Sequence, residues 1–180
     1  ASRGKVRLMA EMMPAVTDPG HQMVEAAVEA TLAREPASMR PRVEHGGDVE
    51  SIERVRRLAR LGIIPVITPQ QERATTPGTG SRTTPRYRTL VEAGVMPAAC
   101  SDATGTIPVF SPLGAIASLV ASPEEGGGTP PGEELTFDDA LRMHTIWAAR
   151  SGFEDHDRGS VAVGKFGDLA VLSDDHEGMT

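Results

Sequence analysis

Apolar and polar residues follow two spacings along this chain, and the spacing changes from one segment to the next. Apolar residues at helical spacing predict helices, at 23–33, 51–61, 86–93, 112–121 and 137–150. Short apolar runs between them predict strands, at 6–13, 42–45, 63–67 and 95–100. Because strands and helices alternate with short connections, the pattern predicts parallel βα units.

The last part of the chain departs from this alternation. Two short strands are expected there, at 159–163 and 168–172, on either side of a turn at 165–167. Stretches rich in Gly, Pro, Ser and Thr at 75–85 and 122–133 are typical of loops. The closing pair of strands indicates a separate small β element.

Composition excludes several kinds of protein and partner. The chain has 180 residues, of which 39% are apolar and 24% charged, as in a globular domain with a buried core. Its net charge of −7 argues against a nucleic-acid partner, which needs a basic face. No apolar run reaches the roughly 20 residues that span a bilayer, so no membrane partner is expected. The single cysteine excludes an internal disulfide and fits a reducing, cytoplasmic compartment.

Two predicted strands end in side chains that can bind metal or move protons. One ends at His45 and the other at Asp102. At the C-terminal ends of parallel strands, a histidine and a carboxylate are the groups that a zinc hydrolase uses. Each also has a plainer interpretation, since a single histidine is often structural and an aspartate before Ala-Thr-Gly often forms a turn.

A set of motifs resembles amidohydrolase family 3, in the branch similar to exoenzyme-regulator-like or N-substituted formamide deformylase-like enzymes. The resemblance covers about residues 17 to 175. Its motifs occur in the family's order, as RVEH (42–45), LGIIPVITPQ (61–70), YRTLVEAGV (87–95), CSDATG (100–105), ELTFDDALRMHTIWAA (134–149) and GSVAVGKFGDLAVL (159–172).

The resemblance implies an α/β fold, the C-terminal part of a (β/α)₈ TIM barrel with a short portion of an accessory β-sandwich. Residues 1–155 would form about strands 5–8 and the final helices, and residues 156–180 would begin the sandwich. A whole barrel needs roughly 250 residues. We therefore expect a fragment whose partner is the missing N-terminal half of the barrel, and which is inactive alone; a homo-oligomer is left open.

The resemblance also implies one or two zinc ions, or another divalent metal, in the complete enzyme. Metal-activated water would hydrolyse a non-peptide carbon–nitrogen bond of a small-molecule substrate. His45 would be a metal ligand, and Asp102 would bind metal and act as the general base and acid. Ser101 and Thr104 would line the substrate site.

One departure from the family pattern favours a second hypothesis. The family has a histidine at the end of its fifth strand, and Thr17 stands at that place in TDPGH (17–21). Threonine is a poor zinc ligand, so His21 is the candidate substitute, although a histidine in the first turn of a helix is usually exposed. The alternative function is a degenerate, metal-free barrel that binds a small molecule or another protein.

The remaining candidates have structural interpretations. His144 is expected to pack in or on a helix, His156 and His176 to be solvated, and Cys100 to be an inert buried thiol rather than a nucleophile.

Overall fold

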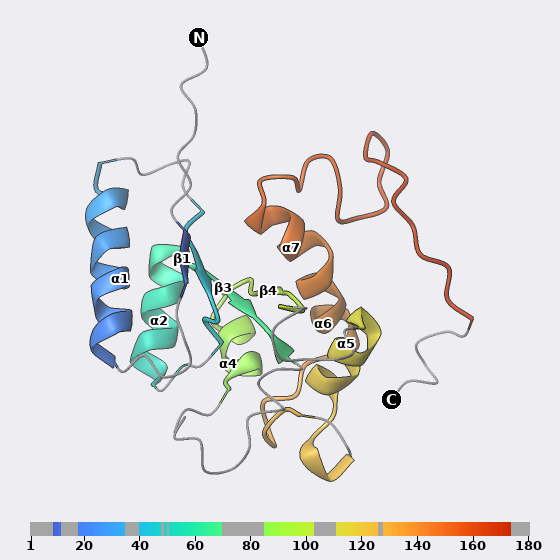
Figure 1. The fold of residues 1–180 in the computed structure, drawn as a ribbon, viewed down its shortest axis with the longest axis horizontal. Helices are drawn as coiled ribbons and strands as arrows, with labels where there is room; N and C mark the ends of the chain where they lie inside the picture. Colours follow the sequence, from blue (N-terminus) through green and yellow to red (C-terminus); the bar gives the residue numbers. More distant parts are fainter. Residues whose placement is uncertain are drawn as a thin grey trace.

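A computed structural model of the chain describes residues 9–11, 18–34, 40–47, 49, 51–69, 85–102, 111–125 and 128–173. Strands and helices alternate in the first part and helices predominate in the second (Figure 1). The strands are β1 (Met9–Glu11), β2 (Arg42–Glu44), β3 (Ile64–Ile67) and β4 (Ala98–Ala99). The helices are α1 (Asp18–Leu32), α2 (Ile52–Leu61), α4 (Tyr87–Glu92), α5 (Pro112–Val120), η1 (Pro123–Glu125), α6 (Phe137–His144) and α7 (Ile146–Ser151).

The strands form one four-stranded sheet in which every neighbouring pair is parallel. Their spatial order, β1-β2-β3-β4, is also their order in the chain. A doubly wound sheet reverses its strand order at a switch point, whereas a (β/α)₈ barrel adds each strand beside the previous one. The sheet therefore has the topology of part of a barrel, and the predicted parallel βα units are confirmed.

The two faces of the sheet bury different sets of residues. Val43 and Ile67 face α1, α2 and α4 and join the main core, together with Leu58 and Leu90. Ile64, Val66 and Ala98 form a smaller cluster, against which Cys100 and Ala148 of α7 pack. Each fully buried aliphatic side chain contributes about 1.5–3 kcal/mol to stability. All four residues of β3 are buried, which explains its continuous apolar sequence.

Helix α2 begins and ends where its sequence signals indicate. The Ser51 side chain accepts a hydrogen bond from the Arg54 backbone N–H at the first turn. Gly62 follows the last turn with φ +62°, the left-handed conformation that glycine adopts without strain. The chain then enters β3 directly, so the connection from helix to strand is short.

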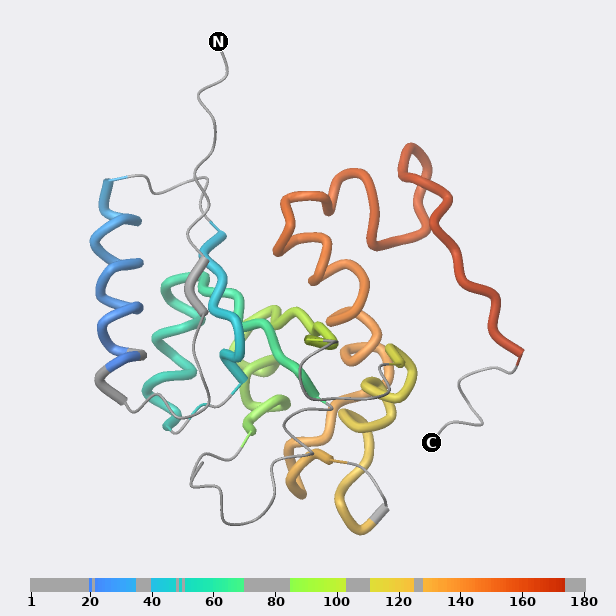
Figure 2. Tube along the Cα trace, in the orientation of Figure 1, coloured from blue at the N-terminus to red at the C-terminus, as the bar shows by residue number. Residues whose placement is uncertain are grey.

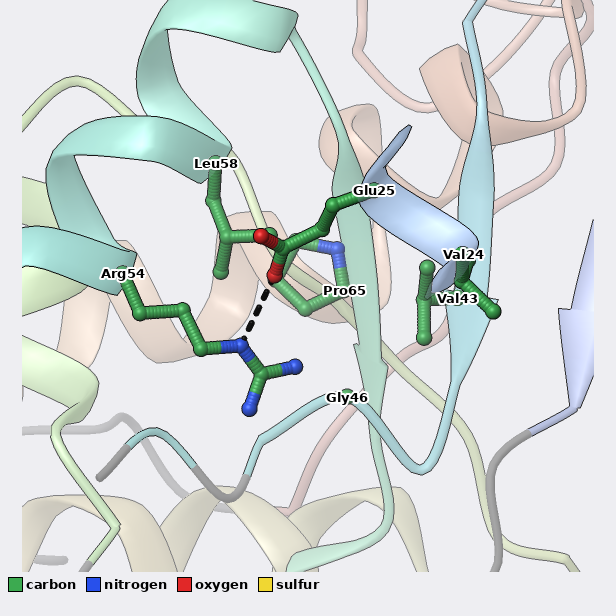
Figure 3. Close-up of a pocket in the computed structure, with 7 residues that line it drawn as sticks. All are labelled: Val24, Glu25, Val43, Gly46, Arg54, Leu58 and Pro65. Carbon is green, nitrogen blue, oxygen red and sulfur yellow. Dashed lines mark hydrogen bonds and ion pairs between the residues drawn. The ribbon is translucent and has the colours of Figure 1, made fainter. Parts of the chain in front are cut away.

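A buried ion pair joins α1 to α2. The Arg54 Nε atom donates to Glu25 Oε1 at 2.9 Å, and Arg57 Nε lies 3.0 Å from Glu25 Oε2. Figure 3 shows Glu25 and Arg54 meeting beside a cavity of about 10 Å³, the size of one water molecule. This cavity lies between these helices and the sheet, so it is part of the packing behind the strands.

The helix predicted over 137–150 is two helices in the structure. The break falls at Thr145, whose φ of −123° and ψ of −97° are not helical. Its hydroxyl donates to the Leu141 carbonyl at 2.8 Å, a contact that bends helices. A Cβ at Gly159 would lie 2.9 Å from the Ile146 Cα, so the returning chain packs closely on this break.

His144 lies at the end of α6, and its Nε2 atom is buried with no hydrogen-bond partner among the described residues. Burial lowers the pKa of this imidazole below its ordinary value of 6.5. The unfolded chain therefore binds a proton that the folded chain does not, and acidification through pH 6.5 lowers the free energy of unfolding.

We expect His144→Phe to remove this part of the acid sensitivity. Urea unfolding of the full-length protein, followed from about pH 7.5 to about pH 5.5, measures it. The exposed His156 offers a matched control, and His156→Gln is expected to keep the wild-type slope. An unchanged slope in His144→Phe would show that His144 is not responsible.

The segment after α7 does not form the two strands expected at 159–163 and 168–172. Residues 159–173 have no regular secondary structure and pair with no strand among the described residues. Residues 161–173 lie apart from the helices (Figure 2). Several of its apolar side chains are exposed, namely Val161, Val163, Phe166, Leu169, Val171 and Leu172. A strand needs a partner, and the described chain supplies none here.

Arg40, just before β2, anchors the start of this segment. Its guanidinium donates to the Arg150 carbonyl at 2.8 Å and to Asp155 Oδ1 at 2.6 Å, and lies 4.8 Å from the Phe153 ring centroid. The hydrogen bond from Arg40 holds the pKa of Asp155 below its ordinary value.

Among the described residues, no helix is long and apolar enough to cross a bilayer.

Candidate active site

Three strands of the sheet end beside one another at the edge where a parallel barrel carries its active site. His45 follows β2, Thr68 follows β3, and Cys100, Ser101 and Asp102 follow β4. The parallel register pairs Glu44 with Val66 and Ile67 with Ala99, so these ends lie at one level. The topology therefore brings together residues that are far apart in the sequence.

His45 and Asp102, both predicted as site residues, face each other across the end of β3. The His45 Nε2 atom lies 3.9 Å from Asp102 Oδ2. The His45 side chain is 15% exposed and that of Asp102 is 48% exposed, so the pair is reached from solvent on the carboxylate side. The structure thus brings these two predicted residues together.

Both residues have left-handed backbone conformations, with φ of +54° at His45 and +45° at Asp102. Such conformations are uncommon outside glycine and cluster at functional sites. After His45, the Gly46 amide donates to the Val66 carbonyl at 3.1 Å. A Cβ at Gly46 would lie 3.0 Å from the Pro65 Cβ, so the missing side chain lets this turn lie directly on β3.

The two side chains are neighbours, but they are too far apart for a direct hydrogen bond. A distance of 3.9 Å exceeds the roughly 2.7–3.2 Å of a hydrogen bond. Neutral imidazole and carboxylate are both common zinc ligands. The imidazole nitrogen and carboxylate oxygen are thus suitable donors for two positions of a metal site. Among the described residues, no group of three or more His, Cys, Asp or Glu side chains is placed so that it could hold a metal ion.

Cys100 is half-buried, two residues before Asp102. Its sulfur lies 3.5 Å from the Thr68 hydroxyl oxygen, and burial raises the pKa of the thiol above 9.0. A protonated thiol is neither a nucleophile nor a metal ligand. The side chain is half-buried, not buried as expected, and the inertness of the thiol stays a prediction.

The chain matches a known protein family along most of its length. A family model described as "Amidohydrolase family" matches residues 12–179. The chain belongs to the amidohydrolase family. The predicted family is therefore confirmed.

Solved structures share the fold of this amidohydrolase chain. A metal-dependent hydrolase from Pyrococcus horikoshii matches 94% of the chain with a TM-score of 0.74 and 16% identity. An amidohydrolase from Thermotoga maritima matches 92% with a TM-score of 0.61 and 19% identity. A mutant atrazine chlorohydrolase from Arthrobacter aurescens, in complex with zinc and atraton, matches 89% with a TM-score of 0.54 and 18% identity.

The amidohydrolase chain spans only part of each of these proteins. It covers 34%, 37% and 34% of the three structures, respectively. A curated relative, Protein LONG AFTER FAR-RED 3 of Arabidopsis thaliana, is 49% identical over 43 residues, which are 24% of this chain and 7% of that protein. The described sheet is consistent with part of the TIM barrel of these enzymes.

The structure describes only some of the other predicted site residues. Ser101 is half-buried beside Asp102. Thr17 and Thr104 lie outside the described residues, as does His176. His21 is in the first turns of α1, but its side chain is not among those described. His156 is exposed, as predicted, and its Nε2 lies 3.0 Å from Asp157 Oδ2.

Sequence reasoning missed two residues at this edge of the amidohydrolase sheet. Thr68 is 1% exposed and follows the apolar run of β3, so the strand-end criterion that selected His45 would also have found it. Glu44 is partly buried and accepts a hydrogen bond from Arg42 Nε at 3.0 Å. In β2, Arg42 and Glu44 alternate with the buried Val43, a period-two signal that places them on the other face of the sheet.

Proposed function

We propose that this chain contributes His45 and Asp102 to the active site of a metal-dependent hydrolase of non-peptide carbon–nitrogen bonds, such as amides. The main observation behind this proposal is the distance of 3.9 Å between His45 Nε2 and Asp102 Oδ2, at the C-terminal edge of the parallel sheet. Membership of the amidohydrolase family supports this proposal. The metal-dependent hydrolases that share the fold support a divalent cation as the cofactor, and one of their structures contains zinc.

His45 and Asp102 would hold the cation through the imidazole Nε2 and a carboxylate oxygen. A bound divalent ion would polarise the substrate carbonyl and lower the pKa of water. His45 must be neutral to donate its Nε2 lone pair, so its role is confined to ligation.

Asp102 would also move the proton. Its half-exposed carboxylate can accept a proton from the attacking water at Oδ2 and return it to the leaving nitrogen. Because one group serves first as base and then as acid, it must remain close to both reacting atoms. Asp102 stands close after the end of β4, so the sheet supports its position. Ser101 and Thr104 would line the substrate site.

Elemental analysis of the full-length natural protein tests the proposal. We expect one or two zinc ions, or an equivalent divalent metal, per chain, and a marked loss of metal in His45→Ala. His156→Ala is the matched control, since His156 is exposed and distant in sequence from either strand end. If the protein takes up no metal even when zinc is supplied, the metal-free binding protein suggested by Thr17 replaces the hydrolase.

A further inference from the structure

We draw no further inference here: the strongest candidate, the patch of exposed apolar side chains that follows α7 between Val161 and Leu172, carries nothing, because nothing in the described part of the structure shows what covers it.

Discussion

Replacing His45 with alanine is expected to abolish hydrolysis in the full-length protein while leaving its fold intact. The imidazole is one of the two donors at the strand ends, and it lies 3.9 Å from the other. Removing a group that only supports a metal ligand already costs about 10–100-fold in affinity or activity. Loss of the ligand itself should therefore lower activity by more than ~10²-fold.

The measurement is turnover of an amide substrate that the wild type hydrolyses, together with metal content and thermal unfolding. Metal content separates loss of a ligand from loss of a substrate contact, because only the former removes the ion. His156→Ala controls for the loss of an imidazole, since it is exposed and pairs only with its neighbour Asp157 among the contacts described. Full turnover in His45→Ala would exclude His45 as a ligand.

The parts of the fold that could be predicted are those whose signals are local. Helix α2 is bounded by Ser51 and Gly62, which act through contacts within one turn. Strand β3 is apolar at every position because both of its faces are buried. In each case a few neighbouring residues determine the structure, so the sequence pattern is sufficient.

The predictions that differ from the structure depend on distant contacts. The break at Thr145 coincides with the return of the chain at Gly159, which no helical spacing could indicate. The two strands expected after residue 158 have a β-like pattern but no partner among the described residues. A strand is defined by its pairing, so an apolar pattern alone cannot establish one.

In the candidate site, too, the features set by local signals could be predicted and those set by distant contacts could not. His45 and Asp102 could be selected because each directly follows an apolar run, and parallel strands end at one edge. Their separation and left-handed conformations could not be predicted, since they depend on contacts such as the Gly46 amide with the Val66 carbonyl. Thr68 follows an apolar run in the same way, but a single threonine gives no sequence signal for its contact with Cys100.

Replacing Asp102 with asparagine is expected to lower kcat by at least ~10²-fold, the scale of a lost general acid or base. Asparagine has nearly the same shape and tolerates a left-handed backbone as well as aspartate does, so the φ of +45° should be retained. Its amide oxygen can still bind a cation, though more weakly, but it cannot take a proton from water. The loss should therefore appear mainly in kcat, with KM changed less.

Steady-state kinetics across a range of pH, with metal supplied in excess, measures this effect. Excess metal compensates for weaker ligation, so a remaining deficit in kcat reports proton transfer. Asp138→Asn is the matched control, because Asp138 is exposed in the first turn of α6 and far along the chain from either strand end. A near-normal kcat in Asp102→Asn would leave Asp102 as a ligand only, and the proton would then have to be moved by another group at the same edge of the sheet.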